Sequence, residues 1–439
     1  MLQKLKYIYA NLDIHSIEVI KKSFSSMIVK ISGMLIGLLV SVALARLLGA
    51  EGFGIINLAS KIVAIITILG LLGIPQVIIK EVSIGRTQEN WKHIGDVMHT
   101  SYILSGLVTL GVSLVSIFLA PWISENIFNE EKLTFPLIVA LLVLTPQVIS
   151  RLFSSGLIGY RKIWQSNLVD QTLSVAVVGV LLAICYISKV EITINLVAIL
   201  YAIGRLVVTI SIGLYWKKLY AHKLKRTFIS KKILNTSMPL MLVSASLVIS
   251  SSADSVMIGW LSSAKQVGFF SVALKLALLT SFFMQITTST LAPKIAALYN
   301  SGKHLEMQQM VKQITKGLTI IGALVLGTII IFGKFILSIW GEEFTEAYWI
   351  LVVLGIGQFF NIASGPVGNL LAMTNNEKVL RNITLITLSL NVLINIVLIN
   401  KFEALGAAIA TATTVVLNMV LCAIFVKKKL GFIPFNLMS

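Results

Sequence analysis

WKKLYAHKLKRTFISKK (Trp216–Lys232) is the most basic stretch of this 439-residue chain, and it lies between two long apolar runs. Its segment, residues 216–235, carries seven lysines and arginines. Apolar runs of about 20 residues recur on both sides of it, and each is long enough to cross the ~30 Å hydrocarbon core of a bilayer. The pattern predicts an all-α integral membrane protein whose two halves are joined by this basic linker.

The composition agrees with a membrane protein. The chain is 56% hydrophobic and 12% charged, whereas an ordinary soluble domain has about 25% charged residues. Its net charge of +18 indicates membrane topology and no nucleic-acid partner, because the basic residues flank apolar runs and form no continuous face. Both cysteines, Cys185 and Cys422, lie inside apolar runs, which argues against a disulfide framework or a zinc site.

Twelve transmembrane helices are predicted from these runs. They cover residues 25–47, 53–79, 97–119, 133–157, 168–187, 193–215, 236–260, 266–291, 313–333, 347–371, 380–399 and 404–426. Lysine and arginine alternate sharply between the connecting segments. They are concentrated in residues 1–24, 80–96, 158–167, 216–235, 292–312, 372–379 and 427–439.

The opposite connections hold only five basic residues, which are Lys132, Lys189, Lys265, Lys334 and Lys401. The positive-inside bias therefore predicts a multi-pass protein with both termini in the cytoplasm. Residues 1–24 are amphipathic and basic without an apolar core, so they are predicted to form a cytoplasmic N-terminus rather than a cleavable signal peptide. Residues 427–439 are predicted to form a basic cytoplasmic tail.

The two halves of the chain resemble each other in sequence. GIINLASK (Gly54–Lys61) and GFFSVALK (Gly268–Lys275) share Gly, Ala and Lys at matching positions. Farther along each half, ISENIFNEE (Ile123–Glu131) lies near the position that corresponds to ILSIWGEE (Ile336–Glu343). The two matches therefore occur in the same order in both halves. These matches predict tandem repeats, with six-helix bundles over residues 25–215 and 236–426 around a central cavity.

Charged residues within the apolar runs are candidate site residues, because a charge at the bilayer centre costs on the order of 2.5–3.5 kcal/mol. Lys61 and Lys275 lie about eight or nine residues inside their helices, beyond easy reach of the headgroups. We interpret them as lining the cavity, with a structural ion pair as the alternative. Lys30 is a further candidate, and Arg151 fits either an interfacial anchor or a cavity wall.

SSSADSVMIGW (Ser250–Trp260) places the rare acid Asp254 among serines. On a helical wheel Ser250, Ser251 and Ser255 fall within about 100° of Asp254, which predicts a wet helix face that lines a cavity. The alternative is that these serines are small packing residues. Gln285 opens QITTSTLAPK (Gln285–Lys294) and is a further candidate for the polar lining.

Motifs of catalysis and nucleotide binding are absent from the sequence, including the P-loop, GxSxG and HExxH patterns. We therefore expect a transporter and no enzyme, cofactor, catalytic residue or metal site. Transport would then draw on an ion gradient, the membrane potential or the gradient of the substrate. The excess of cations over anions inside the membrane favours an anionic substrate.

Two segments resemble a known family. ARLLGAEGFGIINLA (Ala43–Ala59) and ADSVMIGWLSSAKQVGFFSVALKL (Ala253–Leu276) resemble the repeat signatures of Wzx-type polysaccharide flippases. These flippases belong to the multidrug/oligosaccharidyl-lipid/polysaccharide exporter superfamily. The resemblance implies alternating access in a bacterial inner membrane, with an undecaprenyl-diphosphate-linked oligosaccharide moved from the cytoplasmic to the periplasmic leaflet for O-antigen or lipopolysaccharide. It also raises a polymerase and chain-length machinery as partners.

The charge pattern assigns roles within this picture. We hypothesise that Lys61 and Lys275, with Lys30 and Arg151, hold the diphosphate, and that Asp254 is a coupling or gating carboxylate that exchanges partners with Lys275. The coupling ion, proton or sodium, stays open. The alternatives are a multidrug/cation antiporter, which predicts an acid-rich cavity, and a membrane-embedded polymerase or ligase, which needs a large outer loop.

Overall fold

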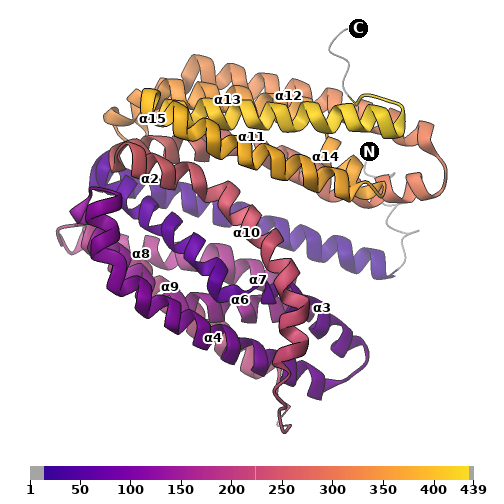
Figure 1. Ribbon diagram of the computed structural model, residues 1–439, viewed down its shortest axis with the longest axis horizontal. Helices are drawn as coiled ribbons and strands as arrows, with labels where there is room; N and C mark the ends of the chain where they lie inside the picture. The colour runs from indigo at the N-terminus through magenta and orange to yellow at the C-terminus, as the bar shows by residue number, and fades with distance from the viewer. Residues whose placement is uncertain (1–13, 223, 435–439) are drawn as a thin grey trace. The chain divides into compact units, whose positions relative to one another are not determined.

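The structure, a computed structural model, describes residues 14–222 and 224–434, and these form helices and connections without a strand (Figure 1). The α-helices are α2 (Ile14–Leu71), α3 (Ile74–Thr87), α4 (Trp91–Trp122), α5 (Thr134–Leu142), α6 (Leu144–Gly159), α7 (Ile163–Asn167), α8 (Ser174–Ile187), α9 (Ile194–Leu219), α10 (Ser230–Leu261), α11 (Ala264–Asn300), α12 (His304–Ser338), α13 (Tyr348–Ala363), α14 (Val367–Met373) and α15 (Glu377–Leu430). The short π- and 3₁₀-helices are η1 (Ile123–Ile127), η2 (Glu131–Leu133), η3 (Leu168–Leu173) and η4 (Glu342–Ala347).

Eight helices in the described chain are long and apolar enough to cross a membrane, and a ninth span results if the pair α5 and α6, bent by 45°, counts as one. The all-α membrane fold is thereby confirmed. Two of the eight are broken inside, α2 at Gly49 (φ 70°) and α15 at Glu403 (φ 51°). These breaks fall between predicted spans, 25–47 and 53–79 in α2 and 380–399 and 404–426 in α15. The number of twelve spans itself stays a prediction.

The chain folds into two compact units, and each unit is built from two separate stretches of the sequence. The first comprises Met1–Leu47 and Ile62–Ile249, and the second comprises Leu48–Lys61 and Ser250–Ser439. The second unit thus contains residues 48–61 of α2, whereas the rest of α2 and most of α10 belong to the first. The six-helix bundles 25–215 and 236–426 stay a prediction.

The first unit has an apolar core in which α3, α4, α6 and α9 pack against one another. Ile78, Met98, Leu157 and Trp216 are among its buried side chains. Gly156 meets the ring of Trp216 so closely that a side chain there would displace it. Two stacked rings, Trp216 and Tyr220, with centroids 6.1 Å apart, close this core where α9 ends.

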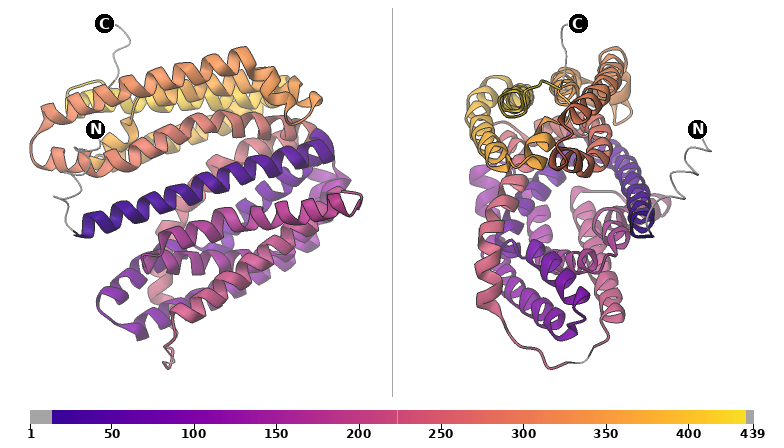
Figure 2. Two further views of the ribbon diagram at one scale, coloured as in Figure 1. Left: turned by 180° about the vertical axis from the view of Figure 1, so that it is seen from behind. Right: turned by 90° about the vertical axis from the view of Figure 1, so that its right-hand side faces the viewer.

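The second unit is built on α11, α12, α13 and α15, which pack side by side (Figure 2). Segment 48–61 crosses α11 with its backbone in direct contact. Gly54 lies against the carbonyl of Ala264, and Gly268 lies against the carbonyl of Ala50, with no room for a side chain at either glycine. Small residues four apart allow such close crossings of membrane helices.

Large apolar side chains cover much of the surface of the spans. Phe118 of α4 is 86% exposed, Ile187 of α8 is 79% exposed and Ile331 of α12 is 74% exposed. An exposed apolar surface of this extent is a liability in water. In a bilayer it is the surface that contacts lipid, and a helical backbone suits that setting because it pairs most of its polar groups within the segment.

Candidate functional site

Two of the predicted cations lie in the second unit. The Lys61 ammonium donates a hydrogen bond of 2.8 Å to the carbonyl oxygen of Ser251, and the Lys275 ammonium lies 5.9 Å from the centre of the Phe53 ring. Both side chains are half-buried. They belong to the same unit because segment 48–61, which ends with Lys61, is part of the second unit.

Asp254 lies in the interior of the second unit and is only 8% exposed. Its carboxylate accepts two hydrogen bonds of 2.7 Å, one from Asn395 Nδ2 and one from Thr411 Oγ1. It also attracts the Lys61 ammonium. A buried carboxylate is tolerated when donors and a cation compensate it. Asp254 therefore faces α15 and Lys61.

A polar network extends from Asp254 along α15. Asn395 donates to Asn391 Oδ1 at 3.0 Å, and Asn391 donates to Thr414 Oγ1 at 3.3 Å. Asn395 is completely buried, and its Oδ1 has no hydrogen-bond partner among the described residues. The carboxylate and this free amide oxygen are both acceptors, the kind of oxygen atom that binds a proton or a hard cation.

The predicted serines divide between two environments. Ser250 and Ser251 are exposed, whereas Ser255 is 2% exposed and packs inside the second unit together with Asp254. Gln285 of α11 is exposed. The structure therefore brings Ser251 and Asp254 together with Lys61, while no interaction joins Ser250 or Gln285 to this group within the described chain.

Arg151 and Lys30 belong to the first unit. Arg151 of α6 lines a cavity of about 210 Å³ together with Gln76, Ser154, Ser155 and Ser244. Gln76 Nε2 donates to Ser244 Oγ at 2.9 Å across this cavity wall, whereas no described side chain forms a hydrogen bond or ion pair with the Arg151 guanidinium. Lys30 of α2 is exposed.

Sequence reasoning missed the partners of Asp254. It weighed charged residues and the polar residues between positions 250 and 294, whereas Asn391, Asn395 and Thr411 are neutral residues much later in the chain. A signal was nevertheless present, since two asparagines four residues apart within an apolar run lie on one helix face. Within the described residues no group of three or more His, Cys, Asp or Glu side chains could hold a metal ion.

Two family models match the chain. Residues 19–299 match a family described as polysaccharide biosynthesis protein, and residues 239–397 match the family MatE. Among curated relatives, the probable flippase AglR of Haloferax volcanii is 23% identical over 91% of this chain and 81% of its own length. The probable low-salt glycan biosynthesis flippase Agl15 of the same organism is 25% identical over 39% of this chain, and that alignment covers only 36% of Agl15.

Solved structures share the fold. The inward closed conformation of the lipid II flippase MurJ has a TM-score of 0.73 at 16% identity, over 93% of this chain and 87% of that one. An inward-facing multidrug resistance transporter of the MATE family has the same TM-score at 13% identity, over 92% of this chain and 98% of that one. At such low identity these likenesses establish the architecture alone.

Proposed function

The chain belongs to the polysaccharide biosynthesis protein family, and on that premise we propose that it is a flippase, a transporter that moves a lipid-linked oligosaccharide from one leaflet of a membrane to the other. The relatives that carry the name flippase support this function. The multi-pass apolar fold also supports it, because a transporter of membrane lipids must itself lie in the bilayer.

The observation that carries the proposal is the pair of ammonium groups at Lys61 and Lys275. Two like charges that are half-buried in one membrane-spanning unit carry a desolvation cost. An anion bound by both would relieve this cost. We propose that this anion is the diphosphate that links the sugar chain to a polyprenyl lipid, with Arg151 and Lys30 as further contacts at another stage of transport.

Further parts of the proposal concern direction and energy. We propose transport from the cytoplasmic to the periplasmic leaflet of a bacterial inner membrane, with both termini cytoplasmic, on the basis of the basic segments. Asp254 is proposed as the site at which a proton or sodium ion couples to transport, because it is a buried carboxylate next to a free amide oxygen. Polymerase and chain-length proteins are proposed as partners that consume the product.

A multidrug/cation antiporter remains the second candidate, since the MatE model matches residues 239–397. A cation substrate calls for acidic side chains in the site. Here the candidate site residues of the second unit include two lysines, Lys61 and Lys275, and a single acid, Asp254, so the balance of charge favours an anionic substrate.

Reconstitution in liposomes tests the proposal. Polyprenyl-diphosphate oligosaccharide with a labelled sugar would be placed in both leaflets, and a membrane-impermeant glycosidase added outside. We expect the chain to make the protected inner half accessible to the enzyme, whereas empty liposomes keep about half of it protected. If the labelled lipid stays protected while a cationic drug is moved, the antiporter is the correct function.

A further inference from the structure

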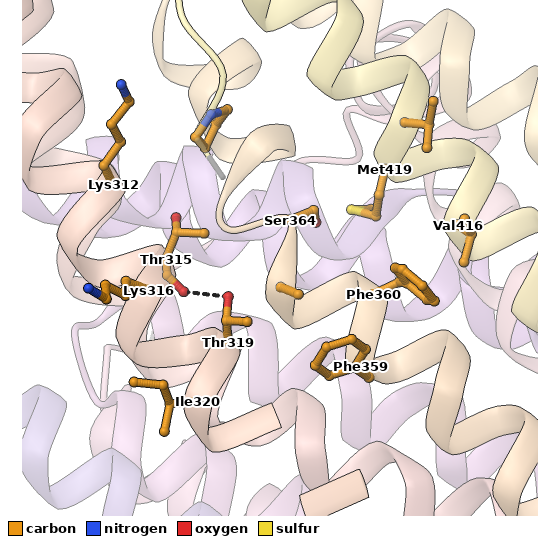
Figure 3. Close-up of a pocket in the computed structure, with 13 residues that line it drawn as sticks. Lys312, Thr315, Lys316, Thr319, Ile320, Phe359, Phe360, Ser364, Val416 and Met419 are labelled. Carbon is orange, nitrogen blue, oxygen red and sulfur yellow. Dashed lines mark hydrogen bonds between the residues drawn. The ribbon is translucent and has the colours of Figure 1, made fainter. Parts of the chain in front are cut away.

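A pocket of about 460 Å³ lies within the second unit, between α12, α13 and α15 (Figure 3). Much of its wall is apolar, with Phe359 and Phe360 from α13 and Val416, Met419 and Val420 from α15. Its volume is within the ~300–1,000 Å³ of small-molecule sites. None of the residues proposed to hold the diphosphate or the coupling ion lines it.

One side of the pocket is basic and carries hydroxyl groups. Lys312 and Lys316 are four residues apart on α12, opposite the two phenylalanines, and Thr315 and Thr319 lie between and beside them (Figure 3). No acidic side chain is among the described residues that line the pocket. Within the described chain no acidic side chain forms an ion pair with either lysine. This side of the pocket therefore has uncompensated positive charge.

Thr315 gives an independent sign that a ligand belongs here. Its side chain is 1% exposed, and its Oγ1 has no hydrogen-bond partner among the described residues. A buried hydroxyl without a partner costs on the order of 1–3 kcal/mol, so a native protein usually supplies one. Thr319 does not, because its own hydroxyl donates to the Thr315 carbonyl oxygen at 2.9 Å (Figure 3).

We propose that this pocket binds an anionic phospholipid of the bilayer, with its phosphate at Lys312, Thr315 and Lys316 and one acyl chain along Phe359, Phe360 and Met419. An ammonium and a hydroxyl suit a phosphate oxygen, and the apolar wall suits a hydrocarbon chain. Basic pockets between membrane helices on the cytoplasmic side are typical sites of anionic lipid headgroups. The positive-inside pattern predicts that side for residues 292–312, which adjoin the basic side of the pocket.

The lining favours a phospholipid over the oligosaccharide lipid proposed as the substrate. Amide and carboxylate side chains offer the most acceptors to the many hydroxyls of a sugar chain, and no Asn, Gln, Asp or Glu is among the described residues that line the pocket. All of its residues also belong to the second unit alone. The lipid is therefore a bound component of that unit, and its site does not depend on the flippase proposal.

The test is lipid binding to the purified full chain, measured by native mass spectrometry and by the rise in unfolding temperature on adding phosphatidylglycerol. We expect one tightly retained phosphatidylglycerol, and no comparable retention of phosphatidylcholine with the same acyl chains. The double variant Lys312→Gln/Lys316→Gln should weaken phosphatidylglycerol binding at least tenfold. Thr315→Val, which keeps the shape and removes the hydroxyl, should weaken it severalfold while Thr315→Ser does not.

A matched double variant, Lys294→Gln/Lys378→Gln, removes two exposed lysines of the same predicted side outside the pocket and should bind as the wild type does. An equal loss in both doubles would mean diffuse surface attraction and would overturn the proposal. So would competition by inorganic phosphate at equal potency, or displacement of phosphatidylglycerol by polyprenyl diphosphate, which would make this a substrate site. Unfolding temperatures without added lipid identify a variant that merely misfolds.

Discussion

Gly54 packs against the main chain of Ala264 so closely that no side chain fits between them. The counterpart of this pair in the other repeat is Gly268 against Ala50, which makes the same contact. Each glycine thus meets the repeat equivalent of the alanine four residues before it, as in an isologous two-fold contact. The sequence likeness of GIINLASK and GFFSVALK is therefore matched by a symmetric helix crossing inside the second unit.

Replacing either glycine should separate this crossing. Gly54→Ala and Gly268→Ala each place a methyl group against a backbone carbonyl that cannot move without shifting its helix. We expect a loss of about 1–3 kcal/mol in the free energy of unfolding, the usual cost of overpacking. The thermal unfolding temperature of the detergent-solubilised chain measures it.

Gly106→Ala in α4 is the matched control, because an added methyl group there would meet nothing within 4 Å. We expect it to be neutral or stabilising, since alanine favours a helix over glycine by up to about 1 kcal/mol. Equal unfolding temperatures for Gly54→Ala and Gly106→Ala would show that the tight crossing does not contribute to stability.

Local sequence predicts the apolar helices, whereas the assignment of Leu48–Lys61 to the second unit is not a local property of the sequence. Apolar runs report on the solvent around a segment, so the spans could be predicted from composition. The transfer of Leu48–Lys61 to the second unit is decided by contacts with residues about 200 positions away, such as Ala264. Gly49 was the one local hint, because its positive φ breaks α2.

The candidate site was predictable only in its charged members. Lys61, Lys275 and Asp254 stand out because ions are rare in apolar runs, and the structure brings all three into one unit. Of the wet face expected around Asp254, Ser250 and Ser251 are exposed, whereas Asp254 and Ser255 are buried, and its role as a cavity lining stays a prediction. Neutral side chains of α15, such as Asn395, donate hydrogen bonds to Asp254. A helical wheel of α10 could not predict them, because it contains no information about α15.

Removing one of the paired ammonium groups should weaken substrate binding. Lys275→Gln and Lys61→Gln each delete a charge-assisted contact worth about 1.5–3 kcal/mol, so the KM for the diphosphate-linked substrate should rise about tenfold or more in the liposome assay. Lys265→Gln is the control, because Lys265 lies on the same helix α11 and pairs with Glu346 at 3.5 Å. A similar rise of KM in all three variants would speak against the diphosphate site.

Glu343 should stabilise the start of the helix that follows Gly49. Its Oε1 accepts the Ala50 backbone N–H at 2.7 Å, as an N-terminal cap does. Glu343→Ala should cost about 1 kcal/mol, visible as a lower unfolding temperature. Glu342→Ala next to it removes the same charge from an exposed side chain without this bond and should have no such effect. If the two variants unfold alike, the carboxylate does not cap this helix.

Asp254→Asn should separate the structural and coupling roles of this carboxylate. The amide keeps one acceptor oxygen but turns a donor toward Asn395 or Thr411, and one lost buried hydrogen bond costs about 1–3 kcal/mol. Thr411→Val removes one of the two donors and leaves the carboxylate, so it should lower stability to a similar extent. If Asp254 couples an ion to transport, only Asp254→Asn should abolish the dependence of the flipping rate on an imposed proton or sodium gradient. A wild-type gradient response in Asp254→Asn, or its loss in both variants alike, would restrict Asp254 to a structural role.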